Sequence, residues 1–133
     1  MDTENEYYTT ITADGFRSWM AANDQAEPPQ GGVKFDQLKA RYDLIPPEIE
    51  EAIAQVLSFG AAKYGDRNWE DGMNWGRVYA AMRRHMGAWW SRKDNDPESS
   101  MPHLWHAAAC IAFLVAFEAR GEGNDDRPKR KKE

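Results

Sequence analysis

Three long segments of the chain repeat apolar residues at helical spacing, and proline or glycine bounds them. The clearest spans about residues 46 to 64, where two prolines open the segment and Gly65 follows it. Proline is favoured in the first turn of a helix, and glycine is favoured directly after the last turn. The apolar stripe of this segment consists of Ile49, Ile53, Val56, Leu57 and Gly60. The pattern therefore predicts an amphipathic helix.

Two further long helices are predicted on the same grounds, over about residues 75–93 and from Ser99 or Ser100 to about Arg120. Their apolar stripes are, respectively, Val78, Met82, His85 and Trp89, and His103, His106, Cys110, Phe113, Leu114 and Phe117. The apolar pattern of residues 13–23 predicts a short helix. No segment shows the alternation of apolar and polar residues that is typical of a β-strand. The predicted fold class is all-α, a bundle of three or four main helices.

Breaks in the helical pattern divide the chain into three parts. Proline and glycine interrupt it between residues 27 and 32, and the residues after 120 are mostly charged. Such segments are typical of loops and of solvated tails. We expect an N-terminal arm with a short helix over residues 1–32, a helical domain over residues 33–120, and a disordered charged tail over residues 121–133.

Composition limits the size of the core and the kinds of partner. A chain of 133 residues suits one domain. It buries only about two-thirds of its unfolded surface, so we expect a homo-oligomer. A net charge of -5 argues against nucleic acid as a partner. Cys110 is the only cysteine, and neither a signal peptide nor a membrane-length apolar run is visible. We therefore expect a cytoplasmic protein without a membrane partner.

Glu48 and Glu51 form the first candidate site. They lie about 60° from each other around the first long helix, one turn apart. Two carboxylates in that arrangement can hold Mg2+ or Mn2+ through oxygen ligands. The alternative interpretation is that acidic residues simply favour the positive N-terminal end of a helix.

The histidines form the second candidate site, because His85, His103 and His106 all fall on predicted core-facing stripes. An acidic loop with Asp96 and Glu98 directly precedes the third long helix. Imidazoles and carboxylates inside a helical bundle are a common setting for metal sites. We predict a metal centre with Asp96, Glu98, His103 and His106 among its ligands. The alternatives are hydrogen-bonded core histidines and a solvated acidic turn.

Cationic and aromatic side chains supply the remaining groups that a nucleotide needs. Lysine and arginine bind phosphate oxygens, and aromatic rings can stack on a base. The candidate phosphate-binding residues are Lys34, Arg41, Lys63, Arg83 and Arg84, and the candidate base-binding residues are Trp69 and Trp75. Lys63 is the strongest candidate because it shares a helix flank with Glu48. Under the alternative interpretation these are surface charges and core aromatics. A Gly-rich P-loop is absent from the sequence.

Four segments occur in a fixed order: KFDQLKARYDLIPPE (34–48), VLSFGAAKYGDRNW (56–69), RRHMGAWW (83–90) and DPESSMPHLWHAA (96–108). In this order they resemble the MazG-like dATP/dGTP pyrophosphohydrolases of phages and bacteria. The acidic, tryptophan-rich form also looks like the MazZ members of that family, from phages that replace adenine with 2-aminoadenine.

The resemblance implies an all-α enzyme that uses more than one Mg2+ or Mn2+ ion. It implies hydrolysis of a purine nucleoside triphosphate between the α and β phosphates, which yields the monophosphate and pyrophosphate. The expected substrate is dGTP, with GTP and dATP as alternatives, and the expected role is the control of nucleotide pools in phage infection. The resemblance also implies a homodimer or homotetramer with the site near a subunit interface.

The expected catalytic residues are Glu48, Glu51, Lys63 and His85, of which the resemblance implies the two glutamates. The glutamates would bind the ions, Lys63 and an arginine would stabilise the leaving pyrophosphate, and either a carboxylate or His85 would accept a proton. The chain departs from the family pattern Glu-Glu-x-x-Glu, because position 52 is Ala and position 55 is Gln. The pair His103-x-x-His106 also replaces the expected Glu-x-x-Asp.

Two other functions are compatible with the sequence. The chain can be a nucleotide-binding or sensor module without turnover, or a phage interaction protein that acts through its aromatic N-terminal helix and basic tail. The substitution Glu51→Gln separates the first of these from an enzyme, because an enzyme loses hydrolysis whereas a binding module keeps most of its affinity.

Overall fold

Helices make up all the regular structure of residues 13–22, 31–32 and 34–132, which are the residues that the computed structural model describes. The α-helices in these ranges are α2 (Ala13–Ala22), α3 (Pro47–Tyr64), α4 (Trp75–Trp90) and α5 (His103–Arg120). Short 3-10 turns form η1 (Tyr42–Leu44) and η2 (Asn68–Asp71). The predicted all-α class is confirmed. None of these helices is long and apolar enough to cross a membrane.

The chain divides into two compact units, residues 1–44 and residues 45–133. The first unit contains α2, and the second contains the three long helices. Residues 33–44, which the sequence assigned to the helical domain, fall in the first unit because their described part forms only a 3-10 turn.

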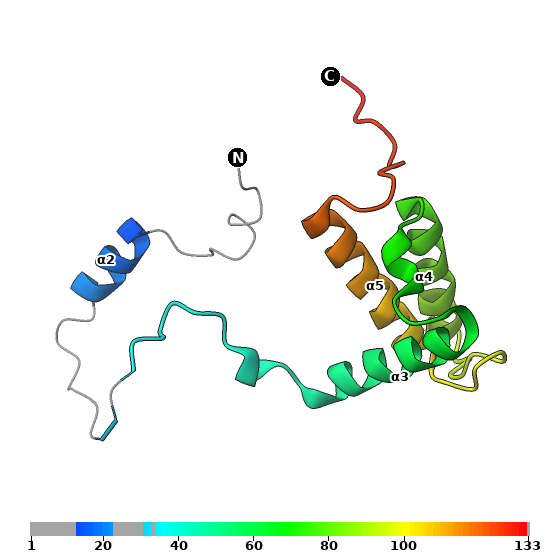
Figure 1. Ribbon diagram of the computed structural model, residues 1–133, viewed down its shortest axis with the longest axis horizontal. Helices are drawn as coiled ribbons and strands as arrows, with labels where there is room; N and C mark the ends of the chain where they lie inside the picture. Colours follow the sequence, from blue (N-terminus) through cyan, green and yellow to red (C-terminus); the bar gives the residue numbers. More distant parts are fainter. Residues whose placement is uncertain (1–12, 23–30, 33, 133) are drawn as a thin grey trace. The chain divides into compact units, whose positions relative to one another are not determined.

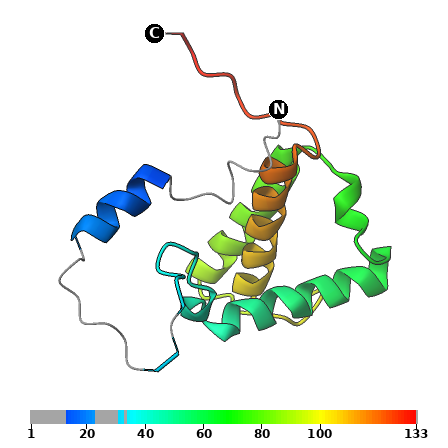
Figure 2. The same cartoon turned by 60° about the vertical axis from the view of Figure 1, so that its left-hand side comes forward.

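Within the second unit, α4 and α5 pack side by side as an antiparallel hairpin, and α3 crosses it near the loop that joins them (Figures 1 and 2). Backbone hydrogen bonds close both ends of the hairpin. At one end the Trp75 amide donates to the Asn124 carbonyl at 3.0 Å, and at the other the His103 amide donates to the Asp94 carbonyl at 2.8 Å. The first half of α5 and its preceding loop are therefore held against the end of α4.

The core of the second unit is small and centres on Phe117, whose side chain is 0% exposed. The other buried apolar residues in the described ranges are Ala52, Val56, Val78, Ala107 and Ala109. The predicted stripes reach the core at Val56, Val78 and Phe117. They are wrong for Ile49 and Trp89, which are exposed in the single chain because the stripes extend beyond the neighbouring helix.

Both ends of the α4–α5 loop differ from the predicted boundaries. α4 ends at Trp90 because Arg92 adopts a left-handed conformation, with φ of 62°, and its amide donates to the Trp89 carbonyl. α5 begins at His103 and not near Ser99, since Pro102 is extended and Ser100 has a φ of 60°. The loop between the two helices is therefore longer than the sequence pattern indicated.

Residues 122–126, here called the C-terminal strap, lie against the start of α4. The Asn124 amide donates to the Met73 carbonyl at 3.1 Å, and the Trp75 indole donates to the Glu122 carbonyl at 2.9 Å. Gly123 has a φ of +74°, and an added Cβ would lie 2.5 Å from the Met73 carbonyl oxygen. The strap thus forms part of the fold, although the sequence predicted a disordered tail from residue 121.

Asp126 caps α4 from the strap, because its Oδ1 accepts a hydrogen bond from the Gly76 amide at 2.7 Å. Asn74, the residue at the cap position, makes no side-chain cap hydrogen bond. Losing a capping carboxylate costs about 1 kcal/mol of stability. Asp126→Ala is therefore expected to lower the free energy of unfolding by about 1 kcal/mol in urea denaturation.

The matched control is Asp125→Ala, because Asp125 forms an exposed ion pair with Arg127. Exposed ion pairs contribute little, so this variant is expected to stay within about 0.5 kcal/mol of the parent chain. Equal effects of the two variants would contradict a capping role for Asp126.

Candidate functional site

A cleft of about 980 Å³ lies in the second unit, between the second half of α3, η2, α4 and the start of α5. Charged, imidazole and aromatic side chains line it together. They are Lys63, Tyr64, Asp66, Arg67, Trp69, Glu70, Arg77, Arg84, His85, Asp96, Glu98, His106 and Phe113. The cleft thus brings cations that suit phosphate next to carboxylates and imidazoles that suit a metal ion.

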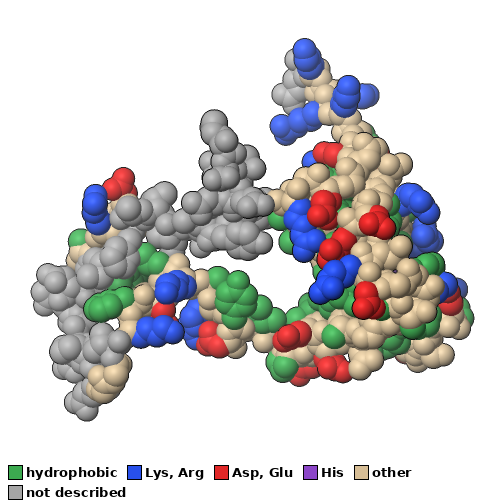
Figure 3. Space-filling view, in the orientation of Figure 1, with side chains coloured by type: hydrophobic (Ala, Val, Ile, Leu, Met, Phe, Trp, Pro, Cys, Tyr) green, Lys and Arg blue, Asp and Glu red, His purple; other side chains and the backbone are tan. Residues whose placement is uncertain are grey.

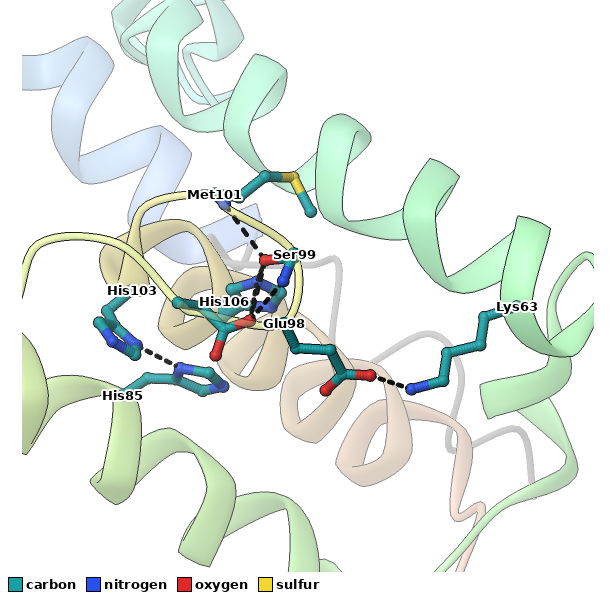
Figure 4. A network of polar contacts seen from close by, with 8 residues as sticks. Lys63, His85, Glu98, Ser99, Met101, His103 and His106 are labelled. Atoms are coloured by element: carbon teal, nitrogen blue, oxygen red, sulfur yellow. Dashed lines mark hydrogen bonds and ion pairs between the residues drawn. The ribbon is translucent and has the colours of Figure 1, made fainter.

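The three histidines converge at one end of this cleft (Figure 4). His85 extends from α4, whereas His103 and His106 extend from the first turn of α5. The Nδ1 atoms of His85 and His103 are 2.8 Å apart. The rings of His85 and His106 stack with centroids 4.7 Å apart. The prediction that all three imidazoles face inward is confirmed, and His103 is the most buried of them, at 7% exposed.

The loop before α5 adds a carboxylate to the cluster. Asp96 Oδ2 accepts hydrogen bonds from the Ser99 amide and the Ser99 hydroxyl, both at 2.9 Å. Ser99 Oγ also lies 2.6 Å from His106 Nε2. Ser99 has a single hydroxyl proton, and when the carboxylate accepts it, His106 donates its Nε2 proton to Ser99. Aspartate followed by proline favours such a turn, which fixes Asp96 beside the imidazoles.

Burial controls the charge of this cluster. Burial lowers the pKa of His85, and the neighbouring His106 and His103 lower it further. Burial also lowers the pKa of His106. For Asp96, burial alone would raise the pKa, but hydrogen bonds from Ser99 outweigh it and the pKa is lowered. These directions favour neutral imidazoles at His85 and His106 beside an ionised Asp96 carboxylate at neutral pH, and neutral imidazole and ionised carboxylate are the forms that bind metal ions.

Three of these residues fit a metal ion. His85, Asp96 and His103 each offer a ligand atom, and these atoms all lie within 4.8 Å of one another. The expected Asp96 and His103 are thereby brought together. His85, which the sequence marked as a catalytic residue, joins them, while His106 contacts Ser99 in this arrangement.

Lys63 and Glu98 connect α3 to the loop before α5 through an ion pair (Figure 4). The hydrogen bond with Glu98 raises the pKa of Lys63. Both side chains line the cleft, as does Arg84 on α4. Lys63, Arg84 and Glu98 therefore line one cleft with His85 and His106, whereas His103 lies behind its lining, and the predicted roles of these residues stay predictions.

Glu48 and Glu51 lie elsewhere, at the exposed N-terminal end of α3, over which acidic side chains gather (Figure 3). Glu51 accepts a hydrogen bond from Gln55 at 2.8 Å. Neither glutamate lines the cleft. Along the helix axis Glu48 is about 22 Å from Lys63, because helical periodicity fixes an angle and not an axial distance. Their metal-binding role stays a prediction.

Other predicted residues are also outside the cleft. Lys34 and Arg41 belong to the first unit, where Arg41 pairs with Asp43. Arg83 is exposed and donates to the Tyr79 hydroxyl at 3.2 Å. The guanidinium carbon of Arg127 lies over the Trp75 ring, 5.0 Å from the ring centroid. Their roles in phosphate or base binding stay predictions.

Trp69 does line the cleft, but its ring is largely engaged by its own chain. It stacks on Phe113 with centroids 4.8 Å apart, and Arg120 lies 5.3 Å from its centroid. Sequence reasoning missed Arg77 and the contacts that Ser99 makes with Asp96 and His106. The position of Ser99, three residues after Asp96 in a turn, is the signal that would have found these contacts.

Comparison with known proteins assigns the family. Residues 29–127 match the family described as dATP/dGTP diphosphohydrolase, N-terminal. A curated relative, the dATP/dGTP diphosphohydrolase of Salmonella phage PMBT28, is 38% identical over 96 residues, which cover 72% of this chain and 33% of the relative. The chain thus spans about a third of that protein's length. No solved structure matches. The MazG-like and MazZ parts of the resemblance stay predictions. The predicted resemblance to phage dATP/dGTP pyrophosphohydrolases is confirmed, and the chain belongs to the dATP/dGTP diphosphohydrolase, N-terminal family.

Proposed function

We propose that this protein hydrolyses a purine deoxynucleoside triphosphate to the monophosphate and pyrophosphate, with dGTP as the first candidate and dATP or GTP next. The cleft that joins the histidine cluster to Lys63 and Arg84 is the observation that carries the proposal. The name of the phage relative, dATP/dGTP diphosphohydrolase, supports the substrate class. The proposed setting is nucleotide-pool control in the cytoplasm of a phage-infected cell.

The triphosphate binds through the cations of the cleft. Lys63 and Arg84 line it from α3 and α4, and Arg67 and Arg77 add two guanidinium groups. Guanidinium groups form paired hydrogen bonds with phosphate oxygens, and the Lys63 ammonium adds a compact charge. These groups stabilise the negative charge that collects on pyrophosphate as it leaves.

Hydrolysis needs one water and one proton acceptor. The water oxygen forms a bond to the α phosphorus, the bond from this phosphorus to the α–β bridging oxygen breaks, and pyrophosphate leaves with the electron pair. Glu98 would accept the water's proton, because phosphate binding by Lys63 would release the glutamate from its ion pair. Trp69, which lines the cleft, is the candidate residue for contact with the base.

The proposed cofactor is Mg2+ or Mn2+. The imidazole and carboxylate groups beside the cleft would suit Mn2+, with Asp96 and His103 as its first candidate ligands, whereas Mg2+ prefers oxygen ligands such as the carboxylates of Glu48 and Glu51. Such an ion would offset phosphate charge and make water more acidic. The proposed ligands are held in position by the turn that Ser99 closes and by the amide of His103, which donates to the Asp94 carbonyl.

A nucleotide panel tests this function. The chain is incubated with dGTP, dATP, GTP and pyrimidine controls in Mg2+ or Mn2+, and the products are separated by chromatography. We expect monophosphate and pyrophosphate from purine nucleotides, and no product after a chelator is added. Diphosphate with free phosphate would contradict the proposal. Bound nucleotide without products would favour the sensor module, and Glu51→Gln in the same panel tests the predicted role of α3.

Association into a homodimer or homotetramer is proposed on the exposed face of α5. Leu104, Ile111 and Val115 form one apolar stripe on this helix and are 40%, 49% and 57% exposed. A stripe of this kind, beside a small core, favours burial against another copy. Light scattering coupled to size-exclusion chromatography measures the mass, and a monomer at micromolar concentration would contradict this assignment.

A further inference from the structure

The imidazole nitrogens of the histidine cluster indicate which metal ion the cluster would bind. We infer that His85, Asp96 and His103 form a site that selects a first-row transition-metal dication over Mg2+. The inference deepens the proposed function. It rests on that function only for the assumption that a cation binds at this cleft. It makes His85 a ligand, whereas the sequence predicted a proton acceptor.

The spacing of the two imidazoles fits a shared ion. His85 Nδ1 and His103 Nδ1 are 2.8 Å apart, although they come from different helices. Two nitrogens at about 2.0–2.1 Å from one ion lie roughly 2.8–3.0 Å apart as neighbours in octahedral geometry and roughly 3.3–3.4 Å apart in tetrahedral geometry. A shift of a few tenths of an ångström therefore converts the observed contact into a pair of ligands.

The carboxylate is already oriented for the same ion. The hydrogen bonds that Asp96 accepts from Ser99 all end on Oδ2. In the described part of the chain, Oδ1 is therefore the oxygen that is available to a cation. His106 helps to hold Asp96 and His85 in position, because it hydrogen-bonds to Ser99 and stacks on His85. Outer contacts of this kind orient ligands and raise metal affinity.

The donor set determines the selectivity. Mg2+ requires oxygen ligands in near-ideal octahedral geometry and keeps much of its water. Imidazole suits zinc, iron, nickel and copper, and affinity rises along the first row from Mn2+. A site with two imidazoles and one carboxylate therefore disfavours Mg2+. The exposed carboxylates Glu48 and Glu51 on α3 are the contrasting set that would accept Mg2+.

The competing explanation is a direct hydrogen bond between the two Nδ1 atoms in a core that binds no metal. Cobalt separates the two cases, because Co2+ bound by imidazole absorbs visible light with an intensity that depends on its coordination. The full chain is freed of metal and titrated with Co2+ in the absence of nucleotide. The variants are His85→Gln and Asp96→Asn, and circular dichroism checks that each is helical.

The control is Asp94→Asn, because Asp94 is an exposed carboxylate in the same loop and undergoes the same substitution. We expect a visible Co2+ band in the parent and control chains, with at least about 100-fold weaker binding in both site variants. A 100-fold excess of Mg2+ should leave the band in place. If His85→Gln fails to fold, Asp96→Asn alone decides the question.

Three outcomes would overturn the inference: no Co2+ band in the parent chain, an unchanged band in Asp96→Asn, or displacement by equimolar Mg2+. The proposed function fails separately. If the chain binds Co2+ but cleaves no nucleotide, only the proposed function is contradicted. If the chain cleaves dGTP with Mg2+ but shows no Co2+ band, only this inference is contradicted.

Discussion

Phe117→Ala is expected to lower the free energy of unfolding by about 3–5 kcal/mol, because it removes the largest fully buried side chain of the described residues. The loss combines the transfer free energy of the ring with the cavity that it leaves. Few residues of the second unit are buried, so its neighbours cannot easily fill the space. Small domains have total stabilities of about 5–15 kcal/mol, and this variant would therefore approach the threshold of folding.

Urea denaturation followed by circular dichroism measures the effect. Phe117→Leu is the matched control, because it keeps an apolar side chain closer in volume, and we expect a loss of about 1–2 kcal/mol. The aromatic contact to Trp69, at a centroid distance of 5.8 Å, is lost in both variants. A loss below about 1 kcal/mol for Phe117→Ala would contradict the assignment of Phe117 as the centre of the core.

Asp96→Asn is expected to reduce the rate of purine nucleotide hydrolysis at least about 100-fold at a fixed metal concentration. Asp96 is the only carboxylate in the described cluster that lies within ligand distance of His85 and His103. The amide keeps the shape of the side chain but loses the charge that holds a cation. Its nitrogen, if turned towards Ser99, would also disrupt the contacts that position the loop.

Initial rates of pyrophosphate release, measured over a range of metal concentrations, check this result. Partial recovery of the rate at high metal concentration is expected, because the substitution weakens metal binding but leaves the lysine and arginine side chains of the cleft intact. Asp94→Asn should keep the parent rate. A rate for Asp96→Asn within a few-fold of the parent would mean that the essential cation is held elsewhere, and Glu48 and Glu51 would become the first candidates.

The sequence by itself determined the helices and the direction in which their key side chains point. Periodicity and the bounding prolines and Gly65 predicted a helix over about residues 46 to 64, and α3 spans Pro47–Tyr64. The same periodicity placed His85, His103 and His106 on inward faces. These features depend on neighbours within one or two turns of the same helix, and local sequence encodes them directly.

The sequence alone could not determine which side chains meet. The pair His85 and His103 is separated by 18 residues, and Lys63 and Glu98 by 35, so both contacts depend on how the helices pack. Glu48 and Lys63 share a flank of α3 but lie a helix length apart, so only one of them reaches the cleft.

The C-terminal strap illustrates the same limit. Its composition is polar and charged, which predicts disorder, yet Asp126 caps a helix 50 residues away. Side-chain periodicity carries no information about the contacts of the strap. They join the Asp126 carboxylate and backbone groups of the strap to the backbone at the start of α4, and Gly123 permits the close approach. Local sequence decided what each element is, and tertiary packing decided which elements form the core, the cleft and the site, because those contacts join residues distant in the chain.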